Sequence, residues 1–248
     1  MLLKQRNGLK WHEFELLAGY PLVHACFTVH GGISTGSFAS LNFSRTVGDS
    51  PENVQENVQR VKETLNLPYL MIPKMEHKAN IVLMNHPLSE TPIGDALSTR
   101  TANLGLMMTQ ADCQAAIFYD PVRHAMVNAH CGWRGNVHNI YRAAIHHMQQ
   151  TYHSNPKDIL VCISPSLGPE HSEFIHFKNE LPEPFWKFQV RPTFFDLWAI
   201  SEWQLIQEGI LPSHIQIAQI DTYKHTEDYF SFRRSNICGR QATVCALL

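Results

Sequence analysis

The stretch that sets the fold runs from Leu104 to Asn136 and reads LGLMMTQADCQAAIFYDPVRHAMVNAHCGWRGN. Its apolar runs predict three strands, at residues 104–109, 115–119 and 125–129. The short turn at Asp120-Pro121 would join the last two strands. Because Cys113 and His130 lie at the ends of two successive predicted strands, we expect that the fold can bring the thiol close to the imidazole.

Helices are predicted on either side of this stretch. Ser50 is a typical N-cap with Pro51 at the first helical position, and apolar residues fall on one face from Val54 to Leu65. A second amphipathic helix is expected directly after Gly135. The remaining pattern predicts strands at 21–30, 81–84, 159–163, 215–220 and 242–247, a helix capped by Asp196 that stops near Gly209, and a polar connection over 87–100.

The order of these elements predicts the fold class. Some strands are joined by hairpins and others by helices, which favours an α+β fold with mixed β-sheets flanked by helices. Because no linker composition occurs, residues 1–248 should form a single domain. The chain contains neither G-x-G-x-x-G nor G-x-x-x-x-G-K-[ST], so neither standard phosphate-binding loop is present as a motif.

Composition narrows the class of protein. Hydrophobic residues make up 44% and charged residues 17% of the chain, which indicates a globular protein. The formal net charge of −2 makes nucleic acid an unsuitable partner. There is neither a signal-peptide pattern nor an apolar run long enough to span a bilayer, so we expect a soluble cytoplasmic protein with no membrane association. In that compartment the 6 cysteines should be reduced thiols.

His77, Cys113 and His130 are the leading candidates for a metal site. A catalytic metal commonly keeps three protein ligands and one open position, and two imidazoles with one thiolate suit Zn²⁺. The same set would also accept copper. From spacing alone, packed or solvent-facing side chains remain the commoner outcome for such residues.

A rival chemistry uses the same residues without metal. The Cys113 thiolate, activated by His130, would serve a hydrolase or transferase, with Asp112 or Asp95 orienting the imidazole. Two arginines could hold a phosphate or carboxylate as a bidentate fork. They are Arg134, where a buried structural ion pair is the alternative, and Arg233, where a solvated pair with its neighbour is the alternative.

Several motifs in one order identify a resemblance to a known family. They include TQADC at 109–113, HCGWRG at 130–135, YFSFRR at 229–234, GGIS at 31–34, SLNF at 40–43, GDAL at 94–97 and GRQ at 239–241. These motifs resemble the laccase-domain family, which is described as multicopper polyphenol oxidase-like and also as purine nucleoside phosphorylases.

The resemblance implies a single α+β domain and a metal held by His77, Cys113 and His130. It also implies a cytosolic zinc-dependent enzyme that cleaves adenosine, inosine, guanosine and methylthioadenosine with phosphate and that deaminates adenosine. The metal would polarise or deliver the nucleophile, which is phosphate for attack on the ribose or hydroxide for attack on adenine C6. We add from the residues that Arg134 or Arg233 would steady phosphate, Asn42 would contact substrate, and Asp95 or Asp112 would handle a proton or orient a histidine.

The chain also departs from the family pattern. Glu170 and His171 follow Gly168-Pro169 where cysteines are usual, Asp221 replaces another cysteine, and Cys131 replaces an alanine. Met75 and Lys78 replace the usual Gln and Gly near His77.

Alternative functions therefore remain open. These are a copper polyphenol oxidase, a metal-independent Cys-His hydrolase, and a non-enzymatic partner protein. Ordinary laccases use pairs of histidines with a single residue between them (H-x-H), and no such pair occurs among the 15 histidines. We expect small-molecule partners, a nucleoside and phosphate, and a monomer or small homo-oligomer.

Overall fold

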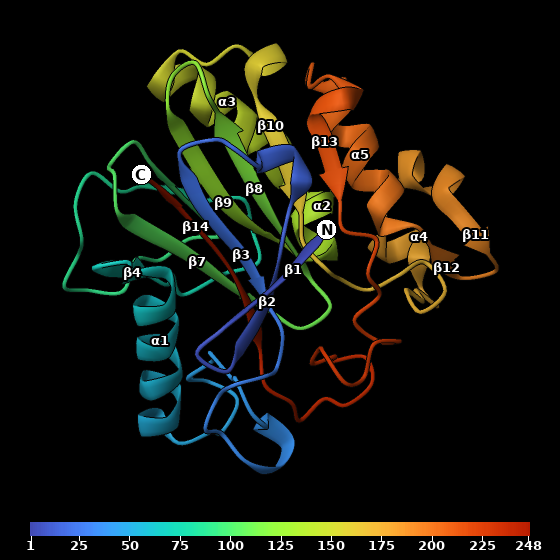
Figure 1. The fold of residues 1–248 in the computed structure, drawn as a ribbon. Coiled ribbons are helices and arrows are strands. Elements are labelled where there is room, and N and C mark those ends of the chain that lie inside the picture. The colour runs from blue at the N-terminus through green and yellow to red at the C-terminus, as the bar shows by residue number, and fades with distance from the viewer.

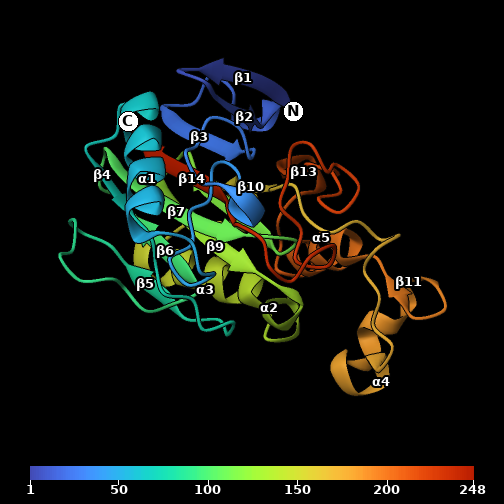
Figure 2. The same ribbon diagram turned by 90° about the horizontal axis from the view of Figure 1, so that it is seen from below.

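Two six-stranded sheets pack face to face between helices in the computed structural model, which describes residues 1–248 (Figures 1 and 2). The first sheet has the order β1-β2-β3-β14-β7-β4, and the second has the order β13-β10-β8-β9-β6-β5. The strands of the first sheet are β1 (Leu2–Arg6), β2 (Leu9–Glu13), β3 (Leu22–Phe27), β14 (Gln241–Leu247), β7 (Leu104–Gln110) and β4 (Tyr69–Met71). Those of the second are β13 (Ile215–Ile217), β10 (Leu160–Ile163), β8 (Gln114–Asp120), β9 (Ala125–Cys131), β6 (Ala96–Thr99) and β5 (Ile81–Leu83).

Both sheets are mixed, as predicted. The β4–β7, β5–β6 and β10–β13 pairs are parallel, and the other pairs in these two sheets are antiparallel. Side chains such as Leu106 and Ile117 fill the space between the sheets. No helix has the length and apolar character needed to cross a bilayer.

Helices cover the two outer faces. Helix α1 (Pro51–Leu65) packs through Val61 on the first sheet, and α3 (Ile140–Tyr152) and α5 (Leu197–Gln207) pack on the second. The remaining helices are α2 (Trp133–Val137) and α4 (Phe177–Glu180). A small segment with α4 and the two-stranded pair β11 (Gln189–Arg191) and β12 (Phe194–Phe195) projects from the body (Figure 2) and packs against α5 through a cluster rich in aromatic side chains. The layers therefore run helix, sheet, sheet, helix.

Several predicted elements are confirmed. Ser50 caps α1 by accepting a hydrogen bond from Asn53 N–H, and Asp196 caps α5 by accepting one from Ala199 N–H. The hairpin of β8 and β9 turns immediately after Asp120. All six cysteines are free.

Other predictions were wrong in detail. The expected single helix after Gly135 is two helices, because Asn139 adopts a left-handed backbone and starts α3 as a new N-cap. The expected polar connection over 87–100 contains the fully buried strand β6. The predicted strand over 215–220 ends at Ile217.

Candidate functional site

The β8–β9 hairpin brings Cys113 and His130 together. Cys113 immediately precedes β8, and the register pairs Ala115 with His130 near the end of β9. Gly132 makes room between them, since a Cβ on this residue would lie 2.9 Å from Cys113 Sγ and 3.8 Å from His130 Cε1. The hairpin and the glycine therefore place the thiol and the imidazole on either side of one small space.

His77 reaches the same space from a loop after β4. Its backbone is left-handed, with φ of 59°, which is unusual for a residue with a side chain. The rings of His77 and His130 meet edge to face with centroids 5.0 Å apart. Three residues that are distant in the sequence thus converge.

Asp95 holds the loop that carries His77. Its Oδ1 accepts the backbone N–H groups of Glu76 at 2.9 Å and His77 at 2.6 Å, and its Oδ2 accepts that of Lys78 at 2.8 Å. The carbonyl of Asp95 also accepts the N–H of His130 at 2.8 Å. This fully buried residue therefore connects the two histidine-bearing segments.

Burial controls the charge state of the site. It raises the pKa of the Cys113 thiol to about 12, and neighbouring Asp112 adds to the effect. Burial, followed by His77, lowers the pKa of His130 to about 3. At neutral pH both groups are uncharged unless a cation stabilises the thiolate. Nδ1 of His130 is buried without a hydrogen-bond partner.

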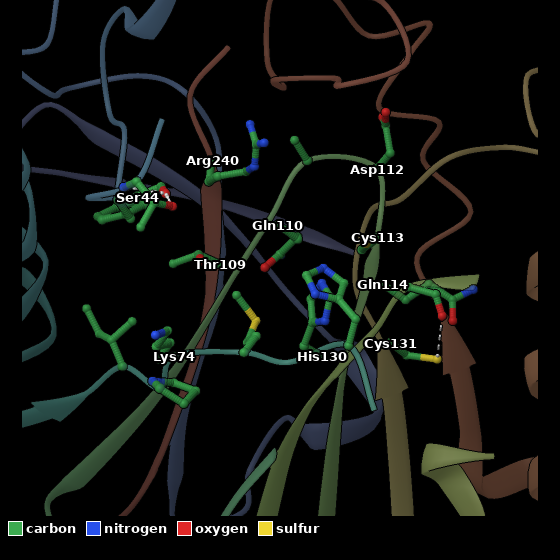
Figure 3. A pocket seen from close by; sticks show the side chains of 18 of the residues that line it. Ser44, Lys74, Thr109, Gln110, Asp112, Cys113, Gln114, His130, Cys131 and Arg240 are labelled. Atoms are coloured by element: carbon green, nitrogen blue, oxygen red, sulfur yellow. Dashed lines mark hydrogen bonds between the residues drawn. The ribbon is translucent and has the colours of Figure 1, made fainter. Parts of the chain in front are cut away.

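These residues line a cavity of about 960 Å³ (Figure 3). His77, Asp112, Cys113, His130, Arg134 and Arg233 all face it, whereas Asp95 and Asn42 are not part of its lining. Figure 3 shows His130 below Gln110 and Arg240, with Cys113 to one side and Lys74 to the other. The cavity is large enough for a nucleoside-sized ligand, since small-molecule sites span about 300–1,000 Å³.

Asp112 makes its hydrogen bonds within the protein. Its backbone has φ of 80°, Oδ1 accepts the hydroxyl of Thr222 at 2.7 Å, and Oδ2 accepts the backbone N–H of Arg233 at 2.6 Å. The guanidinium of Arg233 donates to the carbonyls of His171 and Glu173, each at 3.1 Å. Asp112 therefore ties the turn before Cys113 to the C-terminal loop.

Asn42 lies behind the cavity wall and is fully buried. Its Oδ1 accepts the N–H groups of Ser44 at 3.0 Å and Arg240 at 2.9 Å, and its Nδ2 donates to Asp49 Oδ2 at 2.9 Å. These contacts hold Arg240 at the cavity, where its charge lowers the pKa of both Cys113 and His130. No site role was predicted for Arg240, although it lies within the GRQ motif at 239–241 and its charge after Gly239 was a usable signal.

Arg134 and Trp133 form an aromatic and cationic wall. The guanidinium lies 4.2 Å from the centroid of the Trp133 ring, and Trp133 meets Phe174 edge to face at 5.8 Å. Neither the buried ion pair considered for Arg134 nor any salt bridge of Arg233 is present. Both arginines are exposed to the solvent in the cavity.

The fit of a metal rests on the donor set. Two imidazoles and a thiol meet at the cavity, and the unpartnered Nδ1 of His130 leaves one ring nitrogen without a protein partner. In this structure the side chains do not close into a metal-binding cluster of three or more His, Cys, Asp or Glu. The chemistry of the donors fits zinc or copper, and the ligand set of His77, Cys113 and His130 stays a prediction.

Comparison with known proteins assigns the family. A purine nucleoside phosphorylase of Bacteroides thetaiotaomicron is 30% identical over 246 residues, covering 90% of this chain and 91% of the relative. Purine nucleoside phosphorylase YfiH of Escherichia coli is 26% identical over 91% of this chain and 94% of its own. The crystal structure of YlmD from Geobacillus stearothermophilus superposes with a TM-score of 0.88 at 28% identity, covering 99% of this chain and 98% of that one. Since the family model described as multi-copper polyphenol oxidoreductase laccase matches residues 23–248, this chain belongs to that laccase-domain family.

Proposed function

We propose that this protein is a zinc-dependent purine nucleoside phosphorylase that converts adenosine, inosine, guanosine or methylthioadenosine, with phosphate, into a base and a ribose 1-phosphate. The observation that carries the proposal is the convergence of His77, Cys113 and His130 at one cavity, with Nδ1 of His130 buried and unpartnered. Relatives named purine nucleoside phosphorylase support the reaction class. Adenosine deaminase activity at the same site is part of the proposal.

The protein's own residues would hold the reactants. His77, Cys113 and His130 would hold the metal, which when bound would supply a Lewis acid for the attacking phosphate or for a water molecule. Arg240 and Arg134 would bind phosphate, because both line the cavity and neither has a carboxylate partner. Arg233 would assist them at the rim.

Positioning falls to residues behind the lining. Asp95 would fix the His77 loop, Asn42 would fix the backbone of Arg240, and Asp112 would fix the turn that carries Cys113. The free state of all six cysteines fits the reducing cytoplasm as the place of action.

The test measures metal, reaction and dependence on Cys113 together. The purified protein is analysed for bound zinc and copper and incubated with adenosine in the presence or absence of phosphate, while adenine, ribose 1-phosphate and inosine are separated by chromatography. Adenine that requires phosphate, and that disappears in Cys113→Ala along with the bound zinc, is the expected result. Cys162→Ala is the matched control, because it removes a buried thiol from β10 outside the cavity.

Other outcomes select among the alternatives. Turnover that survives complete metal removal would assign Cys-His chemistry to the site. Copper-dependent oxidation of phenols without nucleoside cleavage would favour the polyphenol oxidase. No turnover of any nucleoside or phenol by metal-loaded protein would refute both enzyme functions and leave the partner-protein hypothesis.

A further inference from the structure

The loop before the last strand presents an aromatic ring at the cavity. Phe232 belongs to the cavity lining and is 52% exposed. Its ring is part of none of the hydrophobic clusters that form the core. Phe232 therefore contributes little to the packing of the protein, and its place at the cavity calls for another explanation.

The backbone on both sides of this ring is held by hydrogen bonds. The N–H and the carbonyl of Phe230 exchange two hydrogen bonds with the side-chain amide of Gln241, at 3.0 and 3.2 Å. The N–H of Arg233 donates to Asp112 Oδ2 at 2.6 Å. Phe232 lies between these two attachments, so its backbone has a fixed position.

Arg234 adds a third attachment to the same loop. Its guanidinium donates to the carbonyls of Thr222 and Tyr223, each at 2.9 Å, and to that of Tyr229 at 2.6 Å. A group that is already fixed before a ligand arrives loses little conformational freedom on binding. The loop is therefore built to hold an exposed ring ready for a ligand.

Two contacts place Phe232 beside the groups that would hold the reactants. The centroid of its ring lies 5.6 Å from the guanidinium carbon of Arg240. The amide that follows it is bound by Asp112, the residue next to the metal-ligand candidate Cys113. Figure 3 shows Arg240 and Asp112 on the same side of His130. Phe232 thus connects the arginine proposed for phosphate with the turn that carries the thiol.

The proposed reaction requires adjacent subsites for phosphate and base. Phosphate attacks C1′ of the ribose and the base leaves from the same carbon, so the groups that bind them are neighbours. Arg240 supplies the charge for phosphate. The ring of Phe232 has neither a charge nor a hydrogen-bonding group, so it suits the flat face of a purine and not the phosphate or the sugar hydroxyls.

Building on the function proposed above, we propose that the purine base of the substrate stacks on the ring of Phe232. Stacking depends on the face of a base and not on the groups along its edge. Adenine, hypoxanthine and guanine differ only along that edge. One aromatic ring therefore serves all three bases at a single site.

The experiment compares the zinc-loaded wild type with Phe232→Ala, Phe232→Tyr and Ile237→Ala. Ile237 is 61% exposed, follows the same loop and lies outside the cavity lining, so its variant controls for the loss of an exposed apolar side chain. The kcat and KM of adenosine and inosine are measured at fixed phosphate, and the KM of phosphate is measured at fixed adenosine. Calorimetry gives the dissociation constants of adenine and of ribose 1-phosphate for each protein.

We expect Phe232→Ala to raise the KM of adenosine and of inosine, and the dissociation constant of adenine, by a common factor of about 5- to 50-fold. The kcat, the KM of phosphate and the dissociation constant of ribose 1-phosphate should change by less than about twofold, because stacking contributes equally to ground state and transition state. Phe232→Tyr keeps the ring and should stay close to the wild type, as should Ile237→Ala.

An unchanged dissociation constant of adenine in Phe232→Ala would overturn the inference, and so would equal losses for adenine and ribose 1-phosphate. Phosphate-dependent cleavage of adenosine would in either case leave the proposed function standing. Binding of adenine that depends on Phe232, without cleavage of any nucleoside, would support the stacking and refute the proposed function.

Discussion

The substitution Asp95→Asn should weaken the metal site through the loop that carries His77. The carboxylate accepts three backbone N–H groups, from residues 76 to 78, and an amide can replace only one of the two acceptor oxygens. Hydrogen bonds to charged groups contribute about 1.5–3 kcal/mol each, and neutral ones about 1 kcal/mol. Losing one bond and the charge behind the other two should lower the free energy of unfolding by about 3 kcal/mol.

The local effect should be larger than the global one. Without Asp95 nothing else in these contacts keeps His77 in its left-handed conformation, so zinc affinity should fall by about 10- to 100-fold. Urea unfolding gives the stability change, hydrogen exchange reports the amides of residues 76–78, and competition with a chelating dye gives the zinc affinity.

Asp120→Asn provides the matched control. Asp120 is equally buried, and its Oδ1 accepts the N–H groups of Val122 and Arg123 in the turn between β8 and β9. That variant should lose stability but keep its zinc affinity. If Asp95→Asn leaves the amides of residues 76–78 protected and binds zinc as tightly as the Asp120→Asn control, Asp95 does not position the His77 loop.

Two further predictions follow from the packing. Gly132→Ala should displace Cys113 and abolish zinc binding, because the new Cβ would lie 2.9 Å from Sγ of Cys113. Gly135→Ala should retain zinc, because the nearest atom to its new Cβ is 3.4 Å away. The zinc content of both variants after dialysis tests this difference. His24 should make stability depend on pH, since burial lowers its pKa, despite Glu13 and Phe14 acting in the other direction. The stability that neutral His24 contributes is complete above its unfolded-state pKa of about 6.5 and is lost as the pH falls through its lower folded-state pKa. The free energy of unfolding should therefore drop by at most about 1.4 kcal/mol per pH unit below pH 6.5. His24→Gln should flatten that slope in urea titrations at pH 5 to 7, and an unchanged slope would contradict the assignment.

The strands and helices with long, regular patterns were predictable from the sequence, and short elements were not. The first hairpin, β1 to β2, went unpredicted although its Asn7-Gly8 turn is a strong signal, with both residues at positive φ in the structure. Strand β6 has four residues, too few to show a period, and its neighbours in the sheet decide its conformation. The break at Asn139 depends on a left-handed N-cap inside an otherwise helical pattern.

The residues of the site likewise include some that the sequence could predict and some that it could not. Cys113 and His130 were predicted to meet because they lie at the ends of two consecutive strands, and the hairpin that joins these strands is a local structure. His77 was a candidate ligand by residue type, but no local pattern predicted its approach to the other two residues, because that approach depends on contacts with Asp95. The structural role of Asn42 and the position of Arg240 likewise depend on contacts between distant parts of the chain, among them a hydrogen bond between these two residues, which are 198 positions apart.

Two departures of this chain from its family pattern lie next to each other in the structure. His171 and Asp221 stand where the pattern has cysteines, and although 50 positions separate them, Nδ1 of His171 is hydrogen-bonded to the carboxylate of Asp221. The His171 ring stacks on Tyr223 at 4.2 Å, and its carbonyl accepts from Arg233. Three residues further on, Phe174 forms part of the cavity wall. The two departures are therefore a contacting pair, and together with Arg233 they hold the chain before Phe174 beside the cavity.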